Sequence, residues 1–182
     1  MQSEGIETRP LRQMTGEAEF DEVFFTNVIL PKSALLGPVN GGWHVGMDIL
    51  TKERGSIGAG AITMQRRLDS LMSLAESELD AHTRQRLAML LTQGKSYHFL
   101  GQRQGPDASV ASSLNKLGIT ELMFDIANLR ANIAGIEALL DGSGSGSLLS
   151  APGARIAGGT SQIQRNIIGE RILGLPKEPR PD

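Results

Sequence analysis

Hydrophobic residues recur at alternating steps of four and three positions between Asn40 and Leu79. This pattern predicts one long helix that packs along the seam of a helical bundle. Its stripe consists of Trp43, Met47, Leu50, Arg54, Ile57, Ala61, Met64, Leu68, Leu71 and Ala75. Arg54 is unusual on an apolar seam, because a guanidinium there must reach solvent, an acidic partner or a polar cavity.

Two more helices are predicted after this one. The first begins near Asp80, a residue suited to an N-cap, and the second runs from about Asp107 to Leu140. Their expected apolar positions are Leu87, Leu90, Leu91, Tyr97 and Leu100 in the first helix, and Val110, Leu114, Leu117, Phe124 and Ala131 in the second. The stretch "DGSGSGSLLSAPG" then predicts a flexible loop. A short C-terminal helix completes a four-helix bundle.

The N-terminal segment before this helical region follows a different pattern. The stretch "EAEFDEVFFTNVILP" is rich in Phe, Val and Thr, which predicts one strand followed by an extended segment that ends at Pro31. One or two strands cannot form a stable sheet by themselves. We therefore interpret this segment as the tail of a β domain whose remainder is missing.

Composition narrows the possible functions. A net charge of -2 over 182 residues gives no electrostatic footprint for nucleic acid or for an anionic membrane. The chain has no cysteine, which excludes disulfides, thiol catalysis and cysteine-ligated metals, and its 3 histidines are too scattered to suggest a metal site. Since it has neither an apolar run of about 20 residues nor a signal-peptide pattern, we expect a soluble, cytoplasmic protein without a membrane span.

The closing stretch "RIAGGTSQIQRNIIGERILGLP" places two glycines and two hydroxyl residues directly before a helix. Ser161 and Gln164 have the spacing of a capping box, and Gly174 is expected to end the helix. Two interpretations follow. The segment is an ordinary capped helix, or the free N–H groups of Gly158 to Thr160 hold a polar ligand.

A second candidate site lies on the long helix. Glu53 and Arg54 are followed by Gly55, Gly58 and Gly60, each of which costs up to about 1 kcal/mol in a helix interior. In one interpretation, Glu53 and Arg54 are a solvated ion pair and the glycines allow close contact between helices. They also fit a carboxylate beside a ligand-filled cleft, in which the glycines make room for the ligand.

Both candidate sites lie in stretches that resemble one family. The stretches "LLGPVNGGWHVGMDILTKERGSIGAGA" and "ARIAGGTSQIQRNIIGERILGLP" are similar to the acyl-CoA dehydrogenase family of flavoenzymes. The resemblance covers nearly the whole chain but only the C-terminal half of the family's usual length. It implies a mainly α fold, in which residues 1–38 are the end of the middle β domain and residues 39–182 are the C-terminal four-helix bundle.

The resemblance also implies an activity. Family members act on acyl thioesters of coenzyme A: a glutamate removes the α proton, and the β hydrogen leaves as hydride to FAD. The product is a 2-enoyl-CoA, and the reduced FAD usually passes its electrons to an electron-transferring flavoprotein. Members assemble as dimers and tetramers, so we expect a homo-oligomer, or a hetero-oligomer with a chain that has the missing domains.

Site residues follow by correspondence with the family's motifs. The base usually stands immediately before the Gly-Thr of the closing motif, a position that Gly158 fills here and at which glycine cannot take a proton. A minority of members have the base on the long helix just before an arginine, which matches Glu53 and Arg54. The resemblance thus implies Glu53 as the catalytic base, Thr51, Arg54, Gly158 and Gly159 as substrate-binding residues, and Thr160, Ser161 and Gln162 as FAD-binding residues.

Two of the family's flavin contacts are missing from this sequence. No "RxxFG" motif follows the long helix, and "NIAGIEALLDGSGSG" stands where the family usually has "QxxGGxG". The chain is a fragment, or another chain supplies the missing parts, or this branch binds FAD with fewer contacts. Two other functions therefore stay open: a non-catalytic partner that supplies the bundle and part of the FAD site, and an acyl-CoA oxidase.

Overall fold

The computed structural model describes residues 3–56, 60–74, 79–103, 108–140, 145–177 and 179. Within these ranges, the side chains of residues 51–56, 60–61 and 108–110 lie outside the description. The chain forms two compact units, residues 1–51 and residues 52–182, which we describe separately. The expected domain boundary after residue 38 stays a prediction.

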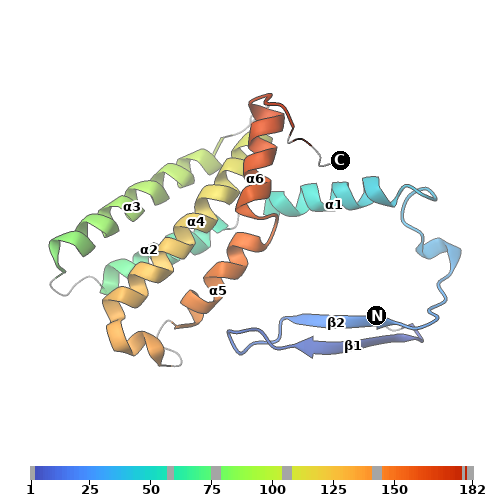
Figure 1. Ribbon diagram of the computed structural model, residues 1–182, viewed down its shortest axis with the longest axis horizontal. Coiled ribbons are helices and arrows are strands. Elements are labelled where there is room, and N and C mark those ends of the chain that lie inside the picture. Colours follow the sequence, from blue (N-terminus) through green and yellow to red (C-terminus); the bar gives the residue numbers. More distant parts are fainter. Residues whose placement is uncertain are drawn as a thin grey trace. The chain divides into compact units, whose positions relative to one another are not determined.

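The N-terminal unit contains an antiparallel hairpin of β1 (Ile6–Leu11) and β2 (Phe20–Phe25), in which Ile6 faces Phe25. The strand expected in the stretch "EAEFDEVFFTNVILP" is confirmed as β2, whereas β1, which lies before that stretch, was not predicted. The sequence of β1, "IETRPL", gives a weak strand signal because it contains Pro10 and two charged residues. Its pairing with β2 forms the small sheet (Figure 1).

The predicted long helix corresponds to α1 (Gly42–Ser56), which follows the short 3-10 turn η1 (Lys32–Ala34), and to α2 (Gly60–Leu74). Residues 57–59 lie outside the described residues, so the continuity of the helix stays a prediction. The apolar stripe enters a core in α2, where Met64, Leu68 and Leu71 are fully buried. Trp43 and Leu50 of α1 are exposed in this chain.

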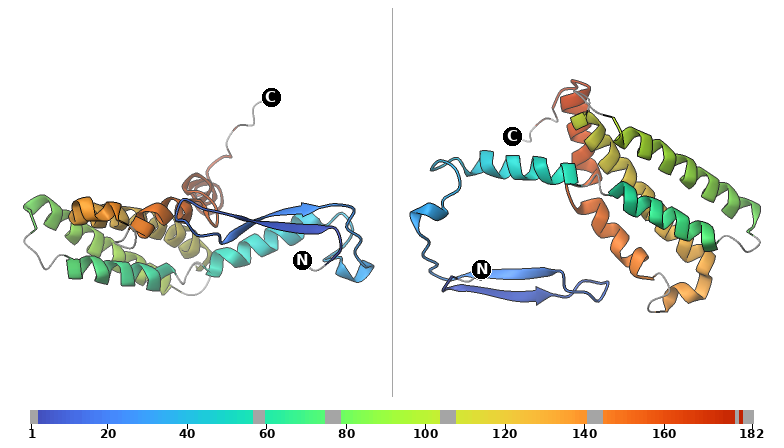
Figure 2. Two further views of the ribbon diagram at one scale, coloured as in Figure 1. Left: turned by 90° about the horizontal axis from the view of Figure 1, so that it is seen from below. Right: turned by 180° about the vertical axis from the view of Figure 1, so that it is seen from behind.

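Helices make up the C-terminal unit, with α4 at its centre. After α2, the elements are α3 (Ala81–Gly101), α4 (Ala108–Ala134), the 3-10 turn η3 (Gly135–Leu139), α5 (Ser145–Ile156), α6 (Ser161–Ile167) and the π-helical turn η4 (Ile168–Ile172). Helix α4 packs against α2, α3, α5 and α6. Figures 1 and 2 show α2, α3, α4 and α5 running side by side as a bundle.

The predicted start of α3 is confirmed. The Asp80 carboxylate accepts hydrogen bonds from the N–H groups of His82, at 2.9 Å, and Thr83, at 3.0 Å. Asp80 is therefore the N-cap of this helix. Leu87 and Leu90 then join the core from α3.

The flexible loop predicted for residues 141–153 was wrong over most of its length. Residues 145 to 156 form helix α5, although they contain Pro152 and several Gly and Ser residues. Ala151 is fully buried, and α5 packs against α4. Burial of this apolar face stabilises a helix that its weak intrinsic propensity would not support.

The predicted buried face of α4 also needs correction. Leu114, Leu117, Phe124 and Ala131 are only partly buried, and the side chain of Val110 is outside the description. The fully buried side chains of α4 are Lys116, Ile119, Leu122, Ile126 and Leu129. Because α4 contacts helices on several sides, a single apolar stripe does not identify the side that is buried most deeply.

No helix in the described parts of the chain has the length and apolar character that a membrane span requires.

Candidate functional site

The glycine pair of the closing motif forms the turn between α5 and α6. Gly158 has a φ of 66° and Gly159 a φ of 98°, in the left-handed region that glycine adopts without strain. A Cβ on Gly159 would stand 2.9 Å from Nε2 of the buried Gln164. The backbone conformation thus favours glycine at both positions, and at Gly159 a close approach of α6 also requires it.

The cap of α6 lies one residue earlier than the capping box predicts. Thr160 is the N-cap, and its hydroxyl oxygen accepts a hydrogen bond from the N–H of Ile163 at 3.3 Å. Ser161 is instead the first helical residue, and its hydroxyl donates to Oε1 of Glu121 on α4 at 2.5 Å. The prediction of a Ser161 cap was therefore wrong, because tertiary contact with α4 takes the hydroxyl away from the helix end.

Lys116 of α4 is hydrogen-bonded to the glycine turn. Its side chain is 2% exposed, and Nζ donates hydrogen bonds to the carbonyl oxygens of Gly159, at 2.5 Å, and Arg155, at 3.2 Å. One ammonium group thus satisfies a carbonyl near the end of α5 and a carbonyl of the turn. Burial lowers the pKa of Lys116, while the negative charge of Glu121 acts in the opposite direction.

Glu121 and Arg155 complete the contacts between α4 and the turn. Arg155 Nη2 lies 3.0 Å from Glu121 Oε2, and its guanidinium carbon lies 4.7 Å from the centroid of the Phe124 ring. The hydrogen bond from Ser161, together with the charge of Arg155, holds the pKa of Glu121 below its usual range. We call Lys116, Glu121, Arg155 and Ser161 the turn clamp, since together they fix both ends of the glycine turn to α4.

Gln164 adds an unsatisfied group beside the turn. Its side chain is fully buried, and its Nε2 donates to the carbonyl oxygen of Gly158 at 2.9 Å. Its Oε1 is buried and accepts no hydrogen bond from the residues that the structure describes. Buried polar atoms are usually paired, so this oxygen is an exception beside the turn.

The predicted site residues fall into two groups. Gly158, Gly159, Thr160, Ser161 and Gln162 are consecutive in the α5–α6 turn and the start of α6, where Ser161 is buried and Gln162 is exposed. Thr51, Glu53 and Arg54 lie in the last turns of α1, and their side chains are outside the described residues. Whether the two groups face one substrate therefore stays a prediction.

Sequence reasoning identified Ser161 but missed the other three residues of the turn clamp, Lys116, Glu121 and Arg155. A signal for Lys116 is present in α4, because Ser113, Lys116 and Thr120 repeat at helical spacing and all three are buried. A polar stripe within an apolar helix indicates a partner for that stripe. Glu121 and Arg155 gave no such signal, and only the tertiary structure brings Glu121 to Arg155 and Ser161.

Comparison with known proteins decides the family. The family model described as "Acyl-CoA dehydrogenase, C-terminal domain" matches residues 40–173, which include the bundle, the glycine turn and the turn clamp. The chain belongs to this family. The recognition made from the two motifs is confirmed, and so is the mainly α fold of this type.

Curated relatives agree with the assignment. The chain is 32% identical to the acyl-CoA dehydrogenase FadE34 of Mycobacterium tuberculosis over 183 residues, which are 97% of this chain and 26% of that protein. It is also 32% identical over 196 residues to the acyl-CoA dehydrogenase IpdE1 of the same organism, which covers 97% of this chain and 49% of the relative. The chain thus spans about a quarter to a half of the length of these acyl-CoA dehydrogenases.

Solved structures show the same fold. A protein titled FAD-dependent dehydrogenase superposes with a TM-score of 0.82 at 24% identity, over 96% of this chain and 52% of that one. The Tcur3481-Tcur3483 steroid ACAD gives a TM-score of 0.85 at 18% identity, over 97% and 50%. Glutaryl-coenzyme A dehydrogenase in its glutaryl-CoA complex gives 0.81 at 20% identity, over 98% and 50%. At these identities the likeness establishes the fold alone.

Proposed function

We propose that this chain is the C-terminal part of an enzyme that converts an acyl-CoA thioester to a 2-enoyl-CoA with FAD as the electron acceptor. Membership of the acyl-CoA dehydrogenase family supports the reaction class. The observation that favours a working site is the turn clamp, because Lys116 and Glu121 fix the glycine turn at which the family's closing motif lies. A site held by buried polar contacts keeps its geometry for chemistry.

Glu53 is the proposed catalytic base. It stands on α1 directly before Arg54, in the motif that some family members use for this role. Gly158 fills the other family position for the base and has no side chain that can accept a proton. The proposal assigns Thr51, Arg54, Gly158 and Gly159 to the substrate, with the glycines bordering the thioester.

The α5–α6 turn also fits part of a flavin site. The proposed FAD contacts are Thr160, Ser161 and Gln162, and when bound, FAD accepts the β hydrogen of the substrate as hydride. The unpaired Oε1 of Gln164 offers an acceptor next to this turn. The absence of a side chain on Gly159 leaves the backbone open to close approach. Because the Ser161 hydroxyl donates to Glu121, we assign its contact with FAD to the backbone N–H.

Electron-transferring flavoprotein is the proposed acceptor of the electrons. The chain is proposed to act as an oligomer with copies of itself or with a chain that has the missing domains.

A role as a non-catalytic partner subunit is a second candidate function. It is favoured by the exposed apolar residues of η3, where Ile136 and Leu139 are each 82% exposed. Such residues are typical of an interface. An oxidase remains the alternative in which oxygen replaces the flavoprotein.

Glu53→Gln tests the proposal. In the assembled enzyme, the variant is expected to retain FAD and acyl-CoA and to slow flavin reduction by at least about 100-fold, because a positioned base is removed without a change of shape. Stopped-flow absorbance of the flavin gives the rate. Asp48→Asn is the matched control, since it removes an exposed carboxylate from the same helix and should leave the rate unchanged.

Parental rates in Glu53→Gln would overturn the assignment of the base. The spectrum of the purified enzyme separates the two candidate functions: bound oxidised flavin that acyl-CoA bleaches indicates the dehydrogenase. A colourless chain that binds a complete family subunit indicates the partner.

A further inference from the structure

Two successive peptide groups of the glycine turn are held by buried side chains from different helices. Nζ of Lys116 on α4 donates to the Gly159 carbonyl oxygen at 2.5 Å, and Nε2 of Gln164 on α6 donates to the Gly158 carbonyl oxygen at 2.9 Å. The exposed fractions of the two donor residues are 2% and 0%. Because water does not compete for these carbonyls, each donor fixes the plane of the peptide that it contacts.

A fixed carbonyl also fixes the N–H group of the same peptide. The described chain has no cis peptide bond, so the N–H of each of these peptides points in the direction opposite to its carbonyl. The N–H of Gly159 thus points away from the Gln164 amide, and the N–H of Thr160 points away from the Lys116 ammonium. Neither N–H donates a hydrogen bond to a residue that the structure describes. The turn therefore presents two N–H groups of fixed direction.

Lys116 differs from Gln164 because it is charged. An ammonium that donates to a carbonyl polarises the peptide, which makes the N–H of that peptide a stronger donor. The same ammonium donates to the Arg155 carbonyl oxygen at 3.2 Å, in the last turn of α5, where the helix dipole favours a cation. Methionine is an unbranched apolar side chain that fits irregular core space. Replacing Lys116 by methionine would therefore remove the charge and the donors with little change in shape.

We propose that Lys116 is a positioning residue for flavin reduction, a role that rests on the proposed function. Gly159 is a proposed thioester contact and Thr160 a proposed FAD contact, so the peptide that joins them lies between the two reactants. Lys116 fixes this peptide and thereby sets the distance between the thioester and the flavin. In this role it touches neither reactant and acts only through the backbone of the turn.

NMR relaxation on the 182-residue chain tests whether Lys116 holds the turn. In the parental chain, the backbone amides of Gly159 and Thr160 should have order parameters of about 0.85, whereas in Lys116→Met they should fall below about 0.6. Lys116→Arg keeps a charged donor and should restore most of the order. If Lys116→Met does not fold, Lys116→Gln provides the same comparison, since it removes the charge but keeps an amide donor.

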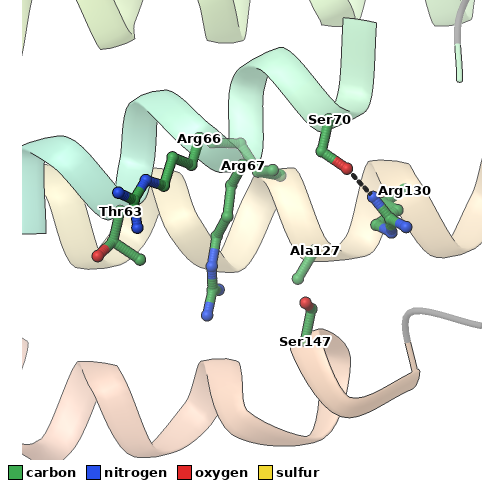
Figure 3. A pocket seen from close by; sticks show the side chains of 8 residues that line it. Thr63, Arg66, Arg67, Ser70, Ala127, Arg130 and Ser147 are labelled. Atoms are coloured by element: carbon green, nitrogen blue, oxygen red, sulfur yellow. Dashed lines mark hydrogen bonds between the residues drawn. The ribbon is translucent and has the colours of Figure 1, made fainter. Parts of the chain in front are cut away.

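Arg130→Met is the matched control for the loss of a cation from α4. Arg130 donates to the Ser70 hydroxyl of α2, in a separate pocket between α2, α4 and α5 (Figure 3). It lies about four helical turns from Lys116, roughly 20 Å at 1.5 Å per residue. The control should therefore leave the order of the turn unchanged. Unchanged order in Lys116→Met, or an equal loss in both variants, would overturn the proposal.

Stopped-flow absorbance of the assembled enzyme separates the rate of flavin reduction from the affinity for substrate. Lys116→Met should slow reduction at saturating acyl-CoA by at least about 10-fold, because a misplacement of about 1 Å can cost about 100-fold. The Kd for acyl-CoA should change by less than about 3-fold, since most substrate contacts are retained. Lys116→Arg should recover most of the rate.

Leu129→Ala represents a purely structural loss. Leu129 is a buried core residue of α4, so the variant should lower the Tm at least as much as Lys116→Met and leave the rate unchanged. Three results would overturn the positioning role: parental rates in Lys116→Met, equal slowing by Leu129→Ala, or a loss confined to the affinity for acyl-CoA. A parental enzyme that reduces no flavin would overturn the proposed function and the positioning role with it. The order parameters of the chain alone would still show whether Lys116 holds the turn.

Discussion

Lys116 occupies a position that an apolar residue would fill in an ordinary bundle core. Its charge is tolerated because Nζ reaches two carbonyl oxygens that lack helical partners, those of Arg155 and Gly159. Glu121 is placed similarly, with Ser161 and Arg155 as its partners. At the scale of single residues, the shape of the glycine turn therefore depends on a few buried or half-buried polar side chains.

Glu121 should make stability depend on pH. Its pKa is lower in the folded chain than the usual value of about 4.3. Its contribution is therefore fully present above that value and is lost as the pH falls through the folded-state pKa. At neutral pH, Glu121→Gln should lower the free energy of unfolding by about 1.5 kcal/mol, the range for hydrogen bonds to a charged group.

Urea unfolding between pH 3 and pH 7 measures this difference. It should shrink toward the acidic end, because the contribution of Glu121 is lost as the pH falls toward its folded-state pKa. Asp125→Asn is the control, because it changes an exposed carboxylate of the same helix. A deficit in Glu121→Gln that stays constant down to pH 3 would contradict the prediction.

Gly159→Ala should strain the turn. The φ of 98° is unfavourable for any residue with a Cβ, and the new methyl group would press on Gln164. The free energy of unfolding is expected to fall by about 1–2 kcal/mol. Gly153→Ala is the matched control: Gly153 lies within α5 with open space around it, so alanine should be neutral or stabilising by up to about 1 kcal/mol.

Chemical denaturation of both variants provides the comparison. In the assembled enzyme, Gly159→Val should also release FAD or acyl-CoA, because its side chain would occupy the proposed approach path. Normal ligand binding by that variant would mean that the turn only caps a helix.

Among the helices, α3 and α4 are in close contact where Gly118 meets Tyr97. A Cβ on Gly118 would overlap the Tyr97 ring, so the two helices can pack only because this position has no side chain. The pattern of apolar residues does not reveal such a contact. It depends on which side of α4 faces α3, and α4 contacts four helices.

Gly118→Ala should therefore destabilise the bundle by about 1–3 kcal/mol, the usual cost of overpacking, despite the better helix propensity of alanine. Thermal unfolding measures the effect. Adding Tyr97→Ala should restore part of it, since the clashing ring is then absent. Gly146→Ala in α5, which has open space, should be harmless. Additive losses in the double variant would argue against a direct clash.

At the scale of the whole molecule, several large apolar side chains are exposed. Trp43 of α1 is 77% exposed, and Ile136 and Leu139 of η3 are each 82% exposed. Soluble monomers seldom leave many large apolar side chains in water without a function for them. We therefore expect these residues to be covered in the assembled protein.

Light scattering at micromolar concentration tests this expectation. The chain should form a dimer or a larger oligomer, and Ile136→Ser combined with Leu139→Ser should shift it toward the monomer. Lys177→Ser is the control, because it changes an exposed polar residue outside η3. A parental chain that stays monomeric would contradict self-association and would indicate that other domains cover these apolar residues.

The sequence alone determined the family, the helical character of most of the chain, the N-cap at Asp80 and the two glycines before α6. These features are local: they depend on propensity, on the spacing of apolar residues, and on conformations that only certain residues adopt. A motif of consecutive residues indicates the same local structure whatever the tertiary packing of the chain. For the same reason, the sequence also identified Glu53 and Arg54 as a candidate pair.

Tertiary structure decided the remainder. It formed helix α5 from a Gly- and Ser-rich stretch, selected the buried side of α4, and turned Ser161 from a cap toward Glu121. It also gathered the arginines of α2 and α4 around one pocket. Each of these outcomes depends on residues from different helices, and the free energy of burial and of satisfied polar groups exceeds that of local propensity. That balance is set only when the helices pack together.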